Sequence, residues 1–297
     1  MNEPRVTGSG PVVPRGLAER ARDISDGRLT PAVPRDAATV ILLRQAVDAG
    51  AGGVGFEAFL LRRTAELEFA PGAFVFPGGS VDASDADPGL GWAGPDPAEF
   101  AALLDVPPDR ARALVCAAVR ETFEESGVLL AGASHDDLVR DSAALAADRH
   151  ALLAGTASLA EVLGRRGLVL RTDLLTPWAR WITPEASPRR FDTWFFVAAL
   201  PPGQAATAAP EGFGDHADPG ESESGAWLRP ASALEASRAG QMTLLPPTAV
   251  TLGELAGHAD VPAILAHRSV ITPRLPKVVV EDGRVRLHLP PAGEERA

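Results

Sequence analysis

The hydrophobic positions of the chain first predict several strands. Residues 38–44 form a nearly continuous apolar run in which β-branched residues lead, and residues 56–63 form a second run after a Gly-rich stretch. Runs of this length and composition are typical of buried strands, so we expect the two segments to pair as a hairpin. Three later runs also predict strands, at residues 178–183, 191–200 and 226–230.

Other segments show the period of a helix. Residues 98–104 predict a short helix, and apolar residues recur at helical spacing in residues 134–165, 248–258 and 261–267. Residues 108–126 predict a longer helix, because proline suits a first helical turn and Gly127 suits a left-handed cap. Near the C-terminus, residues 277–281 and 284–289 flank Asp282-Gly283, which is a two-residue hairpin signal.

These elements predict an α/β (α+β) fold built mainly as one elaborated domain. The 297 residues can bury a large core, and no long Gly/Ser linker separates two complete patterns. We expect residues 1–36 to form a partly disordered N-terminal arm and residues 37–240 to form the main domain, with insertions at about 82–108 and 134–165. Helices and a hairpin in residues 241–297 should pack on the same domain, where they either cover a substrate pocket or form a homodimer contact.

Composition limits the partners of the protein. The formal net charge of −11 argues against a nucleic-acid-binding surface, which is normally basic, and an anionic substrate would need a local cation or arginines. No run of about 18 apolar residues predicts a membrane span, and residues 1–15 lack the apolar core of a signal segment. We therefore expect a soluble cytoplasmic protein. The single cysteine, Cys116, falls where a small buried side chain is expected.

Three carboxylates near the end of the longer predicted helix are the main candidates for chemistry. Glu121, Glu124 and Glu125 fall within an arc of roughly 100° on one helical face, beside its apolar stripe. No Lys or Arg stands four residues beyond any of them to relieve their repulsion. Mg²⁺ and Mn²⁺ prefer carboxylate oxygens, so the trio indicates a hard-metal site. The alternative is a solvated acidic face, which would normally lie farther from the apolar stripe.

The residues around these acids resemble the signature of the Nudix hydrolase family. The second half of that signature reads R-E-U-x-E-E-x-G-U, with U a bulky aliphatic residue, and residues 120–128 read R-E-T-F-E-E-S-G-V. Gly79, in the turn Pro77-Gly78-Gly79, looks like the opening glycine, and Asp85 then falls by count at the early acid. A long insertion separates the two halves. It is similar to the insertion in the branch that includes the animal peroxisomal coenzyme A diphosphatase, and residues 189–196 and 244–247 also look similar to phrases of that branch.

The resemblance implies a Nudix-like α/β/α sandwich around a mixed sheet, with metal-dependent hydrolysis of a diphosphate linked to a group X. It implies Glu121, Arg120 and Glu124 as catalytic residues, with Glu121 the first candidate for the base and Arg120 orienting one of the carboxylates. Mg²⁺ or Mn²⁺ would be held by Glu121, Glu124 and Glu125, together with Gly79. A glutamate in the loop before residue 226, either Glu221 or Glu223, would add a ligand or act as the base.

The resemblance also implies a substrate. Coenzyme A or an acyl derivative is the first candidate, giving 3′,5′-ADP and (acyl-)phosphopantetheine. The alternatives are another nucleotide, such as a nucleotide sugar or a dinucleotide, and a non-catalytic Nudix-like regulator that binds a nucleotide. Arg62 or Arg63 and Arg190 are the expected phosphate contacts. The structural alternatives are a solvated strand end for the first two and an ion pair of Arg190 with Asp192 or a glutamate.

Overall fold

The structure is a computed structural model that describes residues 15–47, 54–64, 70–208, 222–268, 270–281 and 284–289. The chain divides into two compact units. The larger unit consists of Ala37–Trp178 and Trp194–Ile271, and the smaller unit of Met1–Asp36, Ala179–Thr193 and Thr272–Ala297. The boundaries predicted from the sequence for an arm, a main domain and an appended part stay predictions.

The main sheet is mixed and contains the predicted strands. Strands β1 (Arg35–Val47) and β2 (Val54–Arg63) pair antiparallel with Leu43 opposite Ala58, which confirms the predicted hairpin. The strand order runs β10 (Ser222–Leu228), β2, β1, β9 (Phe191–Ala199) and β8 (Thr176–Ile182). Two short strands, β3 (Phe74–Val75) and β4 (Gly78–Ser80), pair with β2 and β1 respectively. The Pro77-Gly78-Gly79 turn therefore lies directly beside β1.

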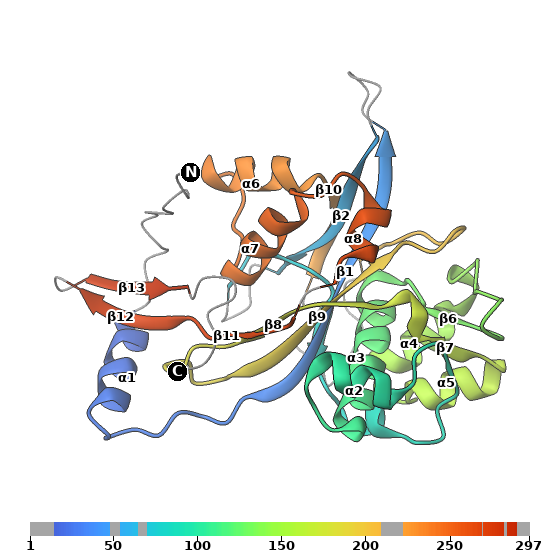
Figure 1. The fold of residues 1–297 in the computed structure, drawn as a ribbon, viewed down its shortest axis with the longest axis horizontal. Coiled ribbons are helices and arrows are strands. Elements are labelled where there is room, and N and C mark those ends of the chain that lie inside the picture. The colour runs from blue at the N-terminus through green and yellow to red at the C-terminus, as the bar shows by residue number, and fades with distance from the viewer. Residues whose placement is uncertain are drawn as a thin grey trace. The chain divides into compact units, whose positions relative to one another are not determined.

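Alternating side chains give this sheet two buried faces. Val40 and Leu42 of β1, and Phe59 and Leu61 of β2, share one buried core with α3 (Pro108–Ser126). Helix α2 (Pro97–Leu104) packs on α3, whereas α6 (Pro230–Arg238) and α7 (Pro246–Leu255) lie on the opposite side of the sheet (Figure 1). A mixed sheet between two helical layers confirms the predicted α/β/α sandwich.

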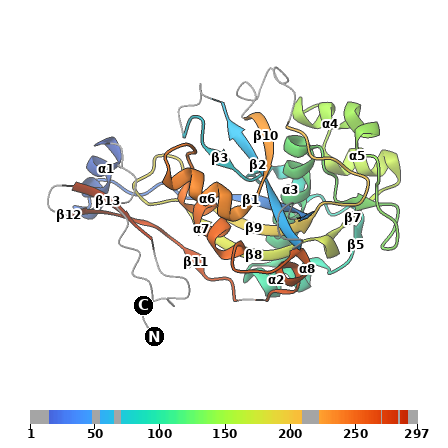
Figure 2. The same cartoon turned by 90° about the horizontal axis from the view of Figure 1, so that it is seen from above.

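A small helical subdomain of the larger unit is built from segments that come before and after α3 in the chain. It contains α4 (Ala146–Leu153) and α5 (Leu159–Arg166), which lie next to α3 in Figure 2, and a three-stranded sheet in the order β5-β7-β6. The three strands are β5 (Trp92–Ala93), β6 (Ala131–Gly132) and β7 (Val169–Arg171). The larger unit also contains the short 3₁₀ helices η1 (Ala83–Ala86), η2 (Ala143–Leu145) and η3 (Thr172–Leu174). The helical prediction for residues 134–165 is wrong for the first third of that range, which forms turns. Ser and Asp side chains there favour turns, and the amide of Asp136 donates to the Ser134 hydroxyl.

The remaining C-terminal elements also match the sequence pattern. Helix α8 (Val261–Ala266) belongs to the larger unit. In the smaller unit, α1 (Arg15–Ser25) contacts β12 (Lys277–Glu281), which pairs antiparallel with β13 (Arg284–His288) (Figure 2). The predicted hairpin is thus confirmed. The short strand β11 (Pro273–Arg274) runs parallel to β8. None of the helices in the described part of the chain has the length and apolar character of a membrane span.

Candidate functional site

The last turns of α3 lie against the double-glycine turn. Pro108 begins the helix and Gly127, at φ 71°, ends it with a left-handed cap, as the sequence predicts. The amide of Gly78 donates to Oε2 of Glu125 at 2.7 Å. A Cβ atom added to Gly79 would lie within 2.5–2.7 Å of the carboxylate atoms of Glu121. The missing side chain at position 79 therefore leaves the space beside β4 that the Glu121 carboxylate occupies.

Arg120 connects the acids of this site. Its side chain is only 10% exposed, and its guanidinium forms two hydrogen bonds with Asp85, from Nε to Oδ1 at 2.9 Å and from Nη2 to Oδ2 at 2.8 Å. Nη1 donates to Glu121 at 2.9 Å and to Glu124 at 3.1 Å, and Nη2 also donates to the Ser80 carbonyl at 2.9 Å. One side chain thus joins α3, β4 and the η1 turn.

The buried cluster contains more negative than positive charge. Burial raises the pKa of Glu121 to about 7, while Arg120 opposes the rise and Glu124 adds to it. Burial also raises the pKa of Glu124 against the effect of Arg120. Burial alone would lower the pKa of Arg120, but Asp85, Glu121 and Glu124 together raise it above its ordinary value, so the guanidinium stays charged. One guanidinium shared among three carboxylates leaves excess negative charge, which a divalent cation would neutralise.

The donors in this cluster suit a hard divalent cation. In the part of the chain that the structure describes, no three acidic, histidine or cysteine side chains converge closely enough to hold an ion as they are placed. Glu121 and Glu124 each accept a hydrogen bond from Arg120, and Glu125 accepts one from the amide of Gly78. Carboxylate oxygens are nevertheless the ligands such ions prefer. Glu121, Glu124 and Glu125 are therefore the residues that would hold the ion.

A cavity of about 570 Å³ opens beside Arg120 and Glu124. Asp82, Ser84, Glu161 and residues 152–158 complete its lining. Its volume falls in the range of roughly 300–1,000 Å³ that is usual for small-molecule sites. The acid cluster is therefore open to a ligand of substantial size.

Comparison with known proteins identifies this arrangement. The family model described as the NUDT19 Nudix domain matches residues 96–255 of the chain. The protein belongs to the Nudix family. The match includes α3 and the whole second half of the signature, and that the Arg120 cluster is the site of the family stays a prediction.

Two curated relatives carry the same name, acyl-coenzyme A diphosphatase NUDT19. The Xenopus laevis protein is 28% identical over 245 residues, which cover 69% of this chain and 61% of the relative. The human protein is 30% identical over 246 residues, which cover 69% of this chain and 62% of the relative. The chain thus spans less than two thirds of the length of these relatives. A solved Nudix hydrolase from Alicyclobacillus acidocaldarius aligns with a TM-score of 0.60 at 24% identity, covering 81% of this chain and 99% of its own, which shows the shared fold.

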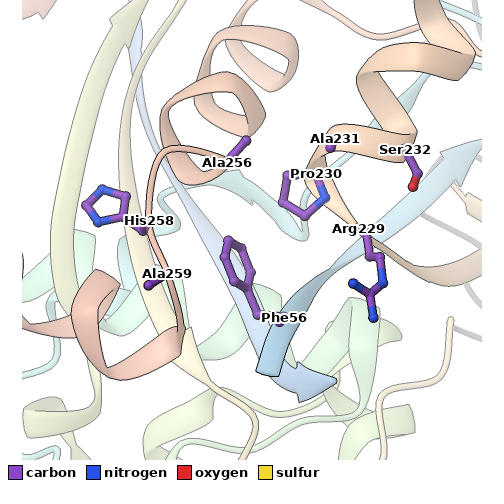
Figure 3. Close-up of a pocket in the computed structure, with 9 residues that line it drawn as sticks. Phe56, Arg229, Pro230, Ala231, Ser232, Ala256, His258 and Ala259 are labelled. Atoms are coloured by element: carbon purple, nitrogen blue, oxygen red, sulfur yellow. The ribbon is translucent and has the colours of Figure 1, made fainter. Parts of the chain in front are cut away.

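A second, smaller cavity of about 180 Å³ lies between β2, α6 and α7 (Figure 3). Phe56, Arg229 and His258 line it, and its described lining residues include no carboxylate. It shares no described lining residue with the Nudix cluster. Its chemistry therefore does not match a divalent cation, and the larger cavity is the candidate substrate site.

The strand geometry separates the two arginines at the end of β2. Successive side chains of a strand point to opposite faces, and Phe59 and Leu61 pack on the α3 face. Arg63 therefore shares the α3 face of this Nudix sheet, whereas Arg62 lies on the face with Leu60. A phosphate contact from either residue stays a prediction.

Arg190 belongs to the smaller unit and is used within it. Its guanidinium donates to the carbonyl of Thr183 at 3.0 Å and of Ala32 at 2.8 Å, and the residue is 8% exposed. The alternative of an Arg190–Asp192 pair is wrong, because Asp192 instead bonds Arg180 through two bonds of 2.8 and 2.6 Å. The substrate contact expected of Arg190 stays a prediction.

The loop glutamates of the Nudix site are described only in part. Glu221 lies outside the described residues. Glu223 falls in β10, where the register with β2 shifts between Ser222, opposite Arg63, and Ser224, opposite Arg62. Its main chain therefore lies beside the end of β2, and its role as a metal ligand or base stays a prediction.

One contact with this site has no local signal in the sequence. Arg149 of α4 donates from Nε to the main-chain carbonyl of Glu124 at 2.9 Å and from Nη2 to that of Thr207 at 3.1 Å. A Cβ atom on Gly127 would lie 2.9 Å from its Nη1, so the glycine cap also makes room for this arginine. Arg149 thereby fixes α4 to the end of the helix that carries the Nudix acids.

Proposed function

We propose that the protein is a divalent-metal-dependent hydrolase that cleaves the diphosphate bond of coenzyme A or an acyl-coenzyme A, giving 3′,5′-ADP and (acyl-)phosphopantetheine. The observation that carries hydrolysis is the set of Glu121, Glu124 and Glu125 packed around Arg120 and the Gly78-Gly79 turn, beside a cavity of about 570 Å³. The coenzyme A part rests on the names of the curated relatives from Xenopus laevis and human.

The residues of the cluster would divide the work of the reaction. Water adds to one phosphorus, the P–O bond to the bridging oxygen breaks, and the proton lost by the water passes to a base. Glu121 is the first candidate for that base, because Arg120 holds its carboxylate and Gly79, which has no side chain, leaves room for it. A glutamate of the 221–223 loop is the second. A bound Mg²⁺ or Mn²⁺ would neutralise phosphate oxygens and activate the water. Arg120 acts as a positioning residue, because it holds Glu121 and Glu124 in place.

Two alternatives remain for this site: hydrolysis of a different diphosphate, and binding of a nucleotide without catalysis. A nucleotide sugar or a dinucleotide contains the same reacting diphosphate. A non-catalytic Nudix-like regulator would not need all of the acidic residues of the signature. This chain keeps both paired glutamates, of which Glu124 accepts from Arg120 and Glu125 accepts from the amide of Gly78. The intact set therefore favours a hydrolase.

A single substitution and a panel of diphosphates test the proposal. Glu124→Gln removes one charge of the cluster, and we expect kcat/KM for coenzyme A with Mg²⁺ or Mn²⁺ to fall by more than about 100-fold, beyond the loss typical of an outer partner. Glu235→Gln, an exposed position on α6, is the matched control and should retain activity. The measurement is release of 3′,5′-ADP. Unchanged turnover in Glu124→Gln would overturn the site, whereas turnover of only a different diphosphate would overturn the substrate alone.

A further inference from the structure

The cavity beside the Nudix cluster has a wall that the reaction itself does not explain. Residues 152–158, here the opposite wall, run from the end of α4 to the start of α5 and line the cavity together with Arg120 and Glu124. Arg149 fixes α4 to the Glu124 carbonyl, and Asp148 accepts bonds from Arg166 at 2.9 and 2.6 Å. Both helices that carry the opposite wall are therefore held in a defined position.

The charges around the cavity disfavour an additional phosphate. Its described lining residues include three carboxylates, those of Asp82, Glu124 and Glu161, and one guanidinium, that of Arg120. Arg120 already donates to three carboxylates and one carbonyl. The backbone amide of Ser84 lowers the pKa of Asp82, which keeps this carboxylate charged at neutral pH. A further phosphate held away from the metal ligands, near Asp82 or Glu161, would therefore face net repulsion.

The main chain of the opposite wall is also unsuited to phosphate. The amides of Ala154, Gly155, Thr156 and Ala157 donate to the carbonyls of His150, Leu152, Ala151 and Ala151 at 2.9, 2.8, 2.9 and 3.2 Å. The amide of Ser158 donates to Oε2 of Glu161 at 2.8 Å. A phosphate-binding loop offers its N–H groups to the ligand, and here these five are used internally. The wall thus presents the apolar side chains of Leu152, Leu153, Ala154 and Ala157 beside the hydroxyls of Thr156 and Ser158, and Asp82 and Glu161 add carboxylate acceptors.

We propose that this cavity takes the uncharged, N–H-bearing arm attached to the diphosphate, and that the opposite wall selects that arm. The inference rests on the proposed function, since the reacting diphosphate must lie at Glu121 and Glu124. An arm with amide N–H groups on an aliphatic chain matches both the acceptors and the apolar wall. In coenzyme A this is the pantetheine arm, and the phosphorylated nucleoside lies outside the cavity.

Substitutions that narrow the cavity test the selection. Ala154→Leu and Thr156→Leu each put a larger apolar side chain on the opposite wall, and Ala147→Leu puts leucine at an exposed position of α4 that does not line the cavity. The substrates are coenzyme A and an analogue with a methyl group in place of the whole arm. We expect each wall variant to raise KM for coenzyme A by about tenfold and to leave KM for the methyl analogue within twofold. Ala147→Leu should change neither value, and thermal unfolding checks that all three variants fold.

Binding of pantetheine alone gives a readout that needs no hydrolysis. With metal-free protein, ligand-observed NMR should detect pantetheine on the wild type and on Ala147→Leu, and the signal should be lost in Ala154→Leu. If the wild type hydrolyses coenzyme A, the kinetic comparison is the test, and equal changes of KM for both substrates would overturn the inference. If the wild type does not hydrolyse coenzyme A, pantetheine binding is the test. Binding that is absent, or that neither wall variant changes, would then overturn the inference. A wild type that binds pantetheine at this wall but hydrolyses no diphosphate would overturn only the proposed function.

Discussion

At the scale of single residues, space and charge decide how the Nudix acids are arranged. Asp85 is 2% exposed and holds two nitrogens of Arg120, which leaves Nη1 directed at Glu121 and Glu124. On the other side, the missing side chain of Gly79 gives Glu121 its place. The position of the Glu121 carboxylate therefore depends on an arginine and on a glycine.

The glycine can be tested with one added methyl group. In Gly79→Ala, the new Cβ would meet the Glu121 carboxylate within 2.5–2.7 Å, so the carboxylate must move. A displacement of about 1 Å at a reacting centre can cost roughly 100-fold, and we expect a loss of that order in kcat/KM. Gly164→Ala is the control, because a Cβ there meets nothing within 4 Å; within α5 it should raise the free energy of unfolding by about 0.5–1 kcal/mol. Full activity in Gly79→Ala would contradict the role given to Gly79.

At the scale of secondary structure elements, strand alternation decides which side chains can reach the site. The hairpin of β1 and β2 sends Val40, Leu42, Phe59 and Leu61 to the α3 face. Arg63 follows in the same series and Arg62 does not. The two neighbouring arginines, equivalent in the sequence, are thereby placed on opposite faces of the sheet.

A paired substitution tests this assignment. Arg63→Met should raise KM for the diphosphate substrate by about tenfold, which is the loss expected for one charge-assisted hydrogen bond. Arg62→Met keeps the length of the side chain at the opposite face and should change KM by less than twofold. Steady-state kinetics on both variants, with urea unfolding as a check on folding, measures the difference. The reverse order of the two effects would show that the strand face is not what selects the contact.

At the scale of the whole molecule, the net charge of −11 makes the acid cluster one part of a generally anionic protein. A divalent cation can therefore act in two ways: by binding at the cluster, and by screening the overall charge. The two effects differ in their dependence on ionic strength and on Glu121, Glu124 and Glu125.

Thermal unfolding separates specific binding from screening. An ion that binds the folded state alone contributes about 2.7 kcal/mol at 100 times its Kd, so Mn²⁺ should raise the Tm of the wild type at an ionic strength held constant with NaCl. The triple variant Glu121→Gln, Glu124→Gln and Glu125→Gln should lose that increase, whatever its own starting Tm. Removal of Mn²⁺ with EDTA should return the wild type to its initial Tm. An equal increase in the triple variant would place the binding outside the cluster.

What the sequence by itself determined is local. The bounds of α3, its glycine cap, the β1–β2 hairpin, the β12–β13 hairpin and the shared helical face of the three glutamates all follow from spacing, proline and glycine. The tertiary structure decided the contacts between distant segments: Asp85 with Arg120, Asp192 with Arg180 rather than with Arg190, and Arg149 with the Glu124 carbonyl. Periodicity and capping act within a few residues, whereas the partner of a buried charge depends on the path of the whole chain.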